Sequence, residues 1–293
     1  MTKEPGGEHI RAHFERVAAA ALDEDLGGAG SEADVTTTSV VGERTWAEGL
    51  VVAKASGVIC GLTALEATFG HLDPRVVVSR ESEDGDEIEP GDVVAGVRGP
   101  ARAILVGERS ALNIMRRLSG IATLVRTFVE RVPGVQITET RKTTPGLRAL
   151  EKYAVRAAGG QNHRFALWDG VLIKDNHIVA AGSVEEAVHR ARRSTTLPVE
   201  VECTSAEEVD EAIGSGATEI LLDNRDPAEL KALVARIRER APKMLIEASG
   251  NVTLDNVEAV AATGVDRISV GAFTHSAPAL DLSLTFEKTW EES

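Results

Sequence analysis

The chain has 293 residues, 43% of them hydrophobic and 27% charged, and its formal net charge of −14 argues against general affinity for nucleic acids or anionic membranes. Aromatic residues make up only 3%, too few for the stacking platforms of single-strand binders. The two cysteines, Cys60 and Cys203, exclude a disulfide framework, so we expect a reducing, cytoplasmic compartment. We expect no signal peptide in the polar N-terminus and no membrane-spanning run.

The first third of the chain predicts a mixed α/β unit. We expect an amphipathic helix over residues 9–26, followed by short apolar runs at 50–53, 57–60, 76–79 and 93–97. Turn-rich polar sequence separates these runs, which is typical of an antiparallel sheet. A second helix is expected from residue 107 to about 132, bent or interrupted at Ser119-Gly120. We place the domain junction in this helix.

After Pro133 the sequence alternates between strand and helix. Strands are expected at residues 136–140, 171–174, 199–203, 219–223, 244–248 and 267–270. The helices between them have clear start and stop signals. Ser183 and Ser205 each begin a capping box, Asp226-Pro227 suits a helix start, and Gly214 and Gly264 suit helix ends.

This alternation predicts a parallel sheet, either open or closed into a barrel. No glycine-rich GxGxxG follows the first strand and no Walker sequence is present, so the pattern does not favour a dinucleotide or P-loop fold.

Polar residues or glycines stand at the carboxyl end of each predicted strand. In a barrel all of these ends meet on one face, where active sites lie. They are Arg141, Lys142, Lys174, Glu202, Asp223, Ser249, Gly250 and Gly271.

A basic stretch points to the ligand. Residues 141–177 contain seven lysines and arginines but three acidic residues, a net charge of +4 that leaves −18 for the rest of the chain. Such a local cluster on an anionic protein favours a site for a small, multiply charged anion. The candidates for it are Arg141, Lys142, His163, Arg164 and Lys174, which suit carboxylates and phosphates. Arg148, Lys152 and Arg156 share one helix face, and we expect them to be solvated.

Two carboxylates, Glu202 and Asp223, end neighbouring strands and are expected to face the same cavity. They suit a metal, ribose hydroxyls or a developing positive charge, or else they are counter-ions for Lys142 and Lys174. Glu200 is expected to point to the opposite side of its strand.

The turn Ser249-Gly250-Asn251 precedes a helix expected to open near Thr253, and Gly271 follows the last strand. Free N–H groups in such turns favour phosphate binding.

At these residues the sequence resembles the quinolinate phosphoribosyltransferase family, nearly end to end. The resemblance is carried by ALDEDLGGAGSEADVTT, GERSALNIMRRLSGIAT, TRKTTPGLRALEKYAV, GGQNHRFALWDGVLIKDNHI, EVE, LLDN, EASGN and ISVGAFTHS. It implies an N-terminal α/β sandwich domain and an incomplete, seven-stranded α/β barrel. We expect the first to span residues 1–117 and the second 118–279, with the tail, about 280–293, packing back on the first.

The resemblance also implies transfer of a phosphoribosyl group from phosphoribosyl diphosphate (PRPP) to quinolinate with decarboxylation, in NAD biosynthesis. It implies Mg²⁺ with PRPP, no organic cofactor, and a homodimer or dimer-based hexamer with shared active sites. Quinolinate would contact Arg109 of the partner subunit, Arg141, His163, Arg164 and Lys174. PRPP would contact Lys142, Lys174, Glu202, Asp223, Ser249, Gly250, Gly271 and His275, with Mg²⁺ near Glu202 and Asp223.

Three alternatives stay open at this point. A related protein associated with molybdenum transport shares the TRK and HR features but not the full IKDNH block. A nicotinate phosphoribosyltransferase would need fewer arginines. A binding protein that keeps the fold without the chemistry would be expected to lack Glu202, Asp223 or Lys142, and all three are present.

Overall fold

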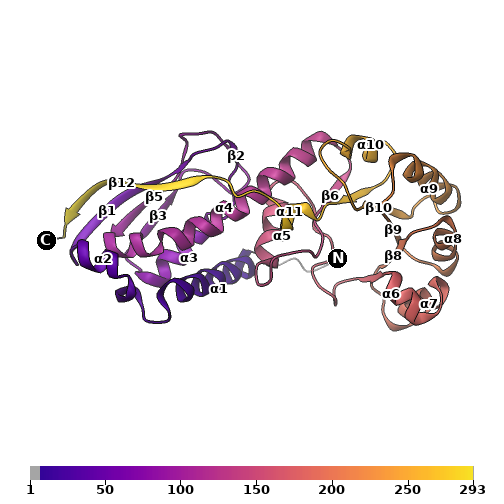
Figure 1. Cartoon of the computed structure of the whole chain (residues 1–293), viewed down its shortest axis with the longest axis horizontal. Coiled ribbons are helices and arrows are strands. Elements are labelled where there is room, and N and C mark those ends of the chain that lie inside the picture. The colour runs from indigo at the N-terminus through magenta and orange to yellow at the C-terminus, as the bar shows by residue number, and fades with distance from the viewer. Residues whose placement is uncertain (1–6, 293) are drawn as a thin grey trace.

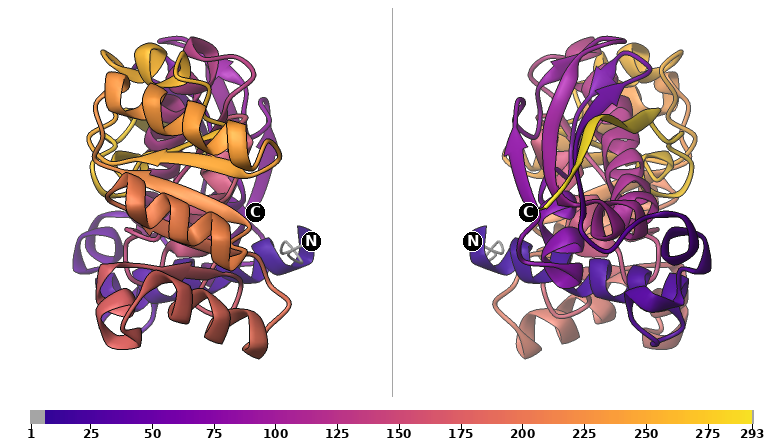
Figure 2. Two further views of the ribbon diagram at one scale, coloured as in Figure 1. Left: turned by 90° about the vertical axis from the view of Figure 1, so that its right-hand side faces the viewer. Right: turned by 90° about the vertical axis from the view of Figure 1, so that its left-hand side faces the viewer.

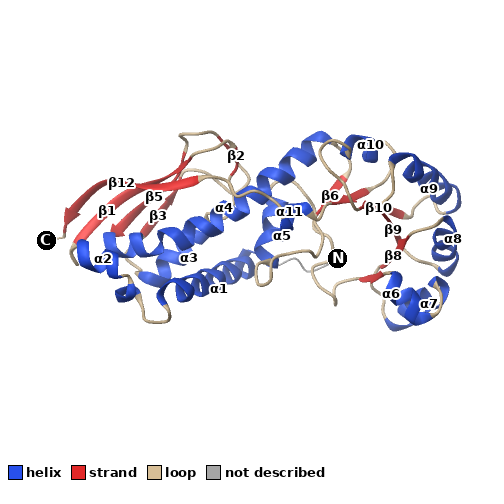
Figure 3. Ribbon diagram, viewed as in Figure 1, coloured by secondary structure: helices blue, strands red, loops and turns tan. Residues whose placement is uncertain are grey.

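The computed structural model describes residues 7–292, so the first six residues of the expected N-terminal domain, and the terminal residue of the tail, lie outside the described part. The molecule is elongated, with an antiparallel sheet at one end and a parallel sheet at the other (Figure 1). A long helix, α4 (Ala101–Arg131), runs from one sheet towards the other (Figure 3).

The N-terminal part packs helices on one face of a four-stranded sheet, ordered β12-β1-β5-β3. Side chains of β1 alternate between buried and half-buried because successive residues point to opposite faces of a sheet. The elements of this part are α1 (Gly7–Leu26), η1 (Ser31–Ala33), α2 (Val35–Val40), β1 (Thr45–Ala53), β2 (Gly57–Val58), α3 (Thr63–Leu72), β3 (Val77–Arg80), β4 (Glu87–Ile88) and β5 (Val93–Pro100). β12 (Leu282–Glu291), at the other end of the chain, pairs antiparallel with β1.

Helix α4 is continuous through Ser119-Gly120, so the expected interruption is absent. Both residues instead serve close packing. The Ser119 hydroxyl accepts the Cys60 N–H at 2.9 Å and donates to the Cys60 carbonyl at 3.1 Å. A Cβ atom on Gly120 would lie 1.9 Å from the Pro278 carbonyl oxygen, so only glycine lets the chain after the barrel cross α4 here.

The C-terminal part is a parallel sheet whose order is β6-β11-β10-β9-β8-β7. All six predicted strands are confirmed, at β6 (Gln136–Thr138), β7 (Val171–Ile173), β8 (Val199–Cys203), β9 (Glu219–Asp223), β10 (Leu245–Ser249) and β11 (Arg267–Ser269). Gln161 forms a single parallel bridge with Thr138, on the free edge of β6. Within residues 7–292 the barrel therefore has six strands, and a seventh strand position is reduced to this bridge.

The helices of this part lie outside the curved sheet (Figures 1 and 2). They are α5 (Arg148–Ala157), α6 (Asp175–Ala181), α7 (Val184–Ser194), α8 (Ala206–Ser215), α9 (Pro227–Arg240), α10 (Val257–Ala261) and α11 (Ala272–His275). None of the helices in the described range is both long and apolar enough to cross a bilayer.

Most of the expected helix signals are found. The Ser183 and Ser205 hydroxyls cap α7 and α8, and Asp226 and Glu229 form a capping box on α9, with Pro227 in its first turn. The expectation for Gly214 is wrong, because α8 continues to Ser215. Gly216, at φ 86°, provides the left-handed C-cap instead.

Candidate active site

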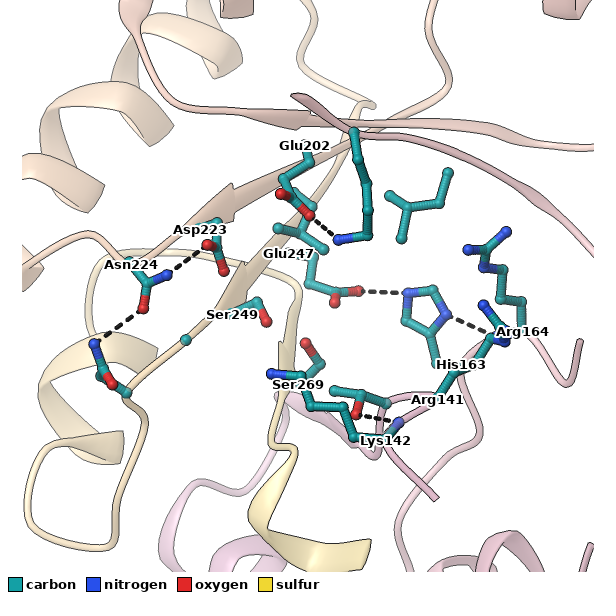
Figure 4. Close-up of a pocket in the computed structure, with 16 residues that line it drawn as sticks. Arg141, Lys142, His163, Arg164, Glu202, Asp223, Asn224, Glu247, Ser249 and Ser269 are labelled. Atoms are coloured by element: carbon teal, nitrogen blue, oxygen red, sulfur yellow. Dashed lines mark hydrogen bonds and ion pairs between the residues drawn. The ribbon is translucent and has the colours of Figure 1, made fainter. Parts of the chain in front are cut away.

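A cavity of about 480 Å³ opens at the carboxyl edge of the parallel sheet (Figure 4). Parallel strands deliver their C-terminal residues to one edge, so residues far apart in sequence line the same space. The lining residues are Thr140, Arg141, Lys142, His163, Arg164, Leu172, Lys174, Glu202, Leu221, Asp223, Asn224, Glu247, Ser249, Gly250, Asn251 and Ser269. The structure therefore brings together nine of the twelve residues expected to contact the substrates.

Arg141, His163 and Arg164 lie together at one side of this cavity (Figure 4). Arg164 donates from Nη1 to the Gly170 carbonyl at 2.9 Å, which holds its side chain against the next strand. The Nε atoms of Arg141 and Arg164 are buried and have no hydrogen-bond partner among the described residues. Burial and the nearby charge of Arg141 lower the pKa of Arg164. Two crowded guanidinium groups with unused donors indicate a site for a carboxylate or another anion.

The predicted carboxylates face these cations. Glu202 forms an ion pair with Lys174, as the counter-ion interpretation predicts. Asp223 ends β9 and accepts a hydrogen bond from Asn224 Nδ2 at 2.5 Å. Both carboxylates line the cavity, so pairing with lysine does not remove Glu202 from the site.

The loops after β9 and β10 form the far wall. Asn224 and Asn251 have positive φ values of 52° and 53°, and Asn251 Nδ2 donates to Asn224 Oδ1 at 3.0 Å. A Cβ on Gly250 would lie 2.2 Å from Asn224 Oδ1, so the contact between the loops requires glycine. The helix expected near Thr253 begins at Val257, which leaves the turn Ser249-Gly250-Asn251 as a loop and not a helix N-terminus.

Gly271 and His275 lie beside the cavity but do not line it. A Cβ on Gly271 would come within 3.2 Å of both Lys142 Cδ and His275 Nε2, so the Gly271 backbone packs against both side chains. The Thr274 hydroxyl donates to the Lys142 carbonyl at 2.9 Å and ties this turn to the strand end.

Arg109 is exposed on the first half of α4, beside the N-terminal sheet, and does not reach the cavity of its own chain.

Glu200 does not point away from the cavity side, so that expectation is wrong. Residues two apart in a strand share one face, and Glu200 and Glu202 both project inward. Glu200 accepts from His163 Nε2 at 3.1 Å and from Arg267 at 2.9 Å. The alternation of side chains along a strand was sufficient to predict this.

Sequence reasoning also missed Glu247, which is fully buried and forms ion pairs with His163, at 3.4 Å from Nε2, and with Arg267. Arg267 reaches Glu219 as well, at 2.7 Å. Strand alternation places Glu247 on the same face as Ser249, but only the register across four strands brings it together with Glu200, Glu219 and Arg267.

This network sets the charge of His163. Burial acts to lower the pKa of the ring, but Glu200 and Glu247 outweigh it and raise the pKa to about 9. Nε2 of the ring faces these carboxylates, and Nδ1 lies 2.8 Å from the Arg164 backbone nitrogen on the other side of the ring. Burial and the charge of Glu247 raise the pKa of Glu200.

Lys152 was expected to be solvated, and this is wrong, because it is only 2% exposed and pairs with the buried Glu139. Arg148 is half-buried and donates from Nε to the Thr143 hydroxyl at 3.0 Å. Arg156 is exposed, as predicted.

The arrangement binds anions on one side and offers carboxylates on the other. Arg141, Arg164 and Lys142 supply positive charge that can hold anionic ligands in the cavity. Carboxylates such as Glu202 and Asp223 can hold a cation or stabilise a developing positive charge.

Two family descriptions match this chain and together cover most of it. The quinolinate phosphoribosyl transferase C-terminal domain matches residues 121–285, and the N-terminal domain matches residues 34–119. Among curated proteins, a probable nicotinate-nucleotide pyrophosphorylase [carboxylating] of Bacillus subtilis is 43% identical over 265 residues, 89% of each chain. The nicotinate-nucleotide pyrophosphorylase [carboxylating] of Rattus norvegicus is 43% identical over 244 residues, 81% of each chain.

Solved structures of the same family resemble this chain as well. The nicotinate-nucleotide pyrophosphorylase from Francisella tularensis superposes with a TM-score of 0.88 at 33% identity, covering 94% of this chain and 97% of its own. A human nicotinic acid phosphoribosyltransferase has a TM-score of 0.58 at 14% identity, covering 92% and 74%, which shows a similar fold alone.

Proposed function

Because this chain belongs to the quinolinate phosphoribosyltransferase family, we propose that the cavity at the carboxyl edge of its parallel sheet is the active site. The enzyme transfers the phosphoribosyl group of PRPP to quinolinate with loss of CO2. The products are nicotinate mononucleotide and pyrophosphate, and the reaction belongs to NAD biosynthesis.

One observation carries the assignment of the site. The cavity places a cluster of cations opposite the carboxylates Glu202 and Asp223, within a volume of about 480 Å³. Quinolinate has two carboxylates on one ring and PRPP has a phosphate and a diphosphate, so both substrates need positive charge. The bond between them forms at a carbon that becomes positively charged, which needs negative charge nearby.

Quinolinate binds on the cationic side. The planar guanidinium groups of Arg141 and Arg164 suit its two carboxylates, and the unpaired Nε atoms give each arginine a donor to spare. His163 and Lys174 complete this side, and the carboxylates behind His163 hold the ring in place.

PRPP binds along the strand ends towards the loops after β9 and β10. Lys142 faces its diphosphate, and Glu202 and Asp223 face the ribose. Ser249, Gly250, Gly271 and His275 hold the 5′-phosphate, and the close packing of Gly271 on Lys142 sets the spacing between the two phosphate sites.

The residues fit Mg²⁺. The carboxylate oxygens of Glu202 and Asp223 are hard donors that line the cavity, and Asn224 binds one of the two Asp223 oxygens. When bound there with PRPP, the ion would neutralise charge on the leaving diphosphate. Lys142 supplies a fixed charge for the same group.

The reaction then follows from the placement of charge. The ring nitrogen of quinolinate attacks C1 of the ribose while the bond from C1 to the diphosphate oxygen breaks. The ring becomes cationic, so it accepts the electron pair left when the neighbouring carboxylate departs as CO2. A proton taken up at that carbon completes the product. The side chains contribute chiefly by orientation and charge.

The assembly and the domain division are part of this proposal. Arg109, exposed on α4, reaches the quinolinate site of a partner subunit in a homodimer, or in a hexamer built from dimers. The chain divides at about residue 117, and the tail from about 280 belongs to the N-terminal unit, which the pairing of β12 with β1 supports. The free cysteines Cys60 and Cys203 fit the reducing cytoplasm.

The test of the site uses variants that remove charge and keep shape. Glu202→Gln and Asp223→Asn are each expected to lower kcat with quinolinate by about a hundredfold, because transition-state charge loses its partner. Thr285→Ser, on the exposed tail strand, serves as the control. Wild-type kcat in both charge variants would place the chemistry elsewhere.

A further inference from the structure

The loop that carries His163 and Arg164 rests on a buried ion pair outside the cavity. Glu139 is fully buried just after β6, and Lys152 on α5 is 2% exposed. Neither residue is among those that line the cavity. The pair is therefore placed behind the site and not in it.

The ion pair binds both backbone groups of His163. Lys152 Nζ donates to Glu139 and to the His163 carbonyl oxygen, the latter at 2.9 Å. The His163 N–H donates to Glu139 Oε1 at 3.2 Å. The lysine and the carboxylate thus hold the residue from its two sides.

The two residues before His163 are held by the same support. Asn162 Nδ2 donates to Glu139 Oε2 and to the Lys152 carbonyl, both at 2.9 Å. The Gln161 N–H donates to the Ile137 carbonyl in β6 at 2.8 Å. Three consecutive residues, 161 to 163, are thereby fixed to β6 and α5.

Burying two charges has a cost that attraction between them only partly offsets. Burial lowers the pKa of Lys152, and this effect is larger than the opposite effect of the Glu139 charge, which raises it. Replacing such a pair by apolar residues is often neutral for stability. Here the charged groups have a role that apolar residues could not fill, because they hydrogen-bond the loop that presents His163 and Arg164.

We propose that Glu139 and Lys152 are positioning residues for quinolinate, acting through the loop that carries His163 and Arg164. The inference rests on the proposed function, which assigns those two residues to the quinolinate carboxylates. Among the described residues, neither Glu139 nor Lys152 hydrogen-bonds the loops after β9 and β10, which build the PRPP half of the site.

The test is the double variant Glu139→Gln, Lys152→Met, which removes both charges and keeps both shapes. Each single variant leaves one buried charge without its partner and is expected to lose stability. In the folded double variant the KM for quinolinate is expected to rise about tenfold or more, with the KM for PRPP changed less than about twofold. Calorimetric titration with quinolinate checks that the change is in binding.

Tyr153→Phe is the matched control. It lies next to Lys152 on α5 but donates its hydrogen bond to Asp84, away from the loop. Its quinolinate KM is expected to stay at the wild-type value. If the double variant does not fold, Asn162→Ala decides: a rise of about threefold or more in quinolinate KM supports the proposal.

A folded double variant with wild-type quinolinate KM overturns the proposal, as does an equal rise in both KM values. A wild-type enzyme that does not turn over quinolinate would contradict the proposed function and, with it, this inference. An active wild type with unaffected variants would contradict the inference alone.

Discussion

The two arginines Arg141 and Arg164 bear on which class of substrate suits the cavity. Their guanidinium groups crowd each other at one side of the cavity, which lowers the pKa of Arg164 through burial and the charge of Arg141. Such crowding is relieved when an anion binds between them. We attribute recognition of a dicarboxylate to this pair.

Replacing either arginine by lysine keeps the charge and loses the planar fork. Arg141→Lys and Arg164→Lys are each expected to raise the quinolinate KM by about tenfold or more, because one bidentate contact is lost. Steady-state kinetics with quinolinate varied at saturating PRPP measures this, and Arg156→Lys on the exposed side of α5 is the control. An unchanged KM in both variants would remove the arginines from substrate recognition.

Titration of His163 makes the stability of the folded protein depend on pH. Its folded-state pKa, about 9, lies above the ordinary value of 6.5 because Glu200 and Glu247 face the ring. The stabilisation is therefore complete below about pH 6.5 and is lost as pH rises through about 9. Between these limits the free energy of unfolding of the wild type should fall by about 3 kcal/mol more than that of His163→Gln.

Urea unfolding at several pH values between 6 and 10 measures this difference. If the free energy of unfolding of the wild type and of His163→Gln changes with pH in parallel, Glu200 and Glu247 do not raise the pKa of the ring as described.

The sequence was sufficient to predict the cavity residues that stand at the ends of strands. Lys142, Lys174, Glu202 and Asp223 follow directly from the strand pattern, and all four line the cavity. The burial of Lys152 could not be predicted in the same way, because it depends on which helix packs behind the site. Glu200 and Glu247 could have been predicted, since strand alternation places them on the same faces as Glu202 and Ser249.

Among the elements, α4 connects the two sheets, and Gly120 is where the chain after the barrel crosses it. Gly120→Ala is expected to destabilise the protein by about 2 kcal/mol or more, because its Cβ would meet the backbone at Pro278. Gly70→Ala is the control, since Gly70 lies exposed in α3 with nothing within 4 Å of an added Cβ. That change is expected to stabilise the helix by up to about 1 kcal/mol.

Thermal and urea denaturation of the two glycine variants compares these effects directly. Equal stability of the two would mean that α4 shifts to accommodate the methyl group at residue 120.

The strands of both sheets were predictable because apolar runs between turns are a strong local signal. The continuity of α4 was not, because Ser119-Gly120 reads locally as a break and only the packing against Cys60 and Pro278 explains it. The start of α10 was placed four residues too early for a similar reason. Asn256 accepts the Thr253 N–H at 2.8 Å and holds that segment as a turn before the helix.

For the whole molecule, the position of Arg109 leads to a prediction about assembly. Arg109 is exposed on α4 and does not reach the cavity of its own chain, whereas the proposed function places it in the site of a partner. Mixing inactive Arg109→Ala with inactive Lys142→Ala should therefore restore one intact site in each mixed dimer. About a quarter of the wild-type activity is expected from random pairing.

The measurement is activity after the two variants are unfolded together and refolded, with mixed dimers counted by a tag on one chain. Mixed dimers that form and stay inactive would show that each site is complete within one subunit.

The most direct test of the account compares quinolinate and nicotinate as substrates, each with PRPP and Mg²⁺, while nicotinate mononucleotide and CO2 are measured together. The account predicts turnover of quinolinate with one CO2 released per nucleotide formed, and little or no turnover of nicotinate. Turnover of nicotinate in preference to quinolinate would contradict the assignment of the arginine pair to a dicarboxylate, and with it the central claim.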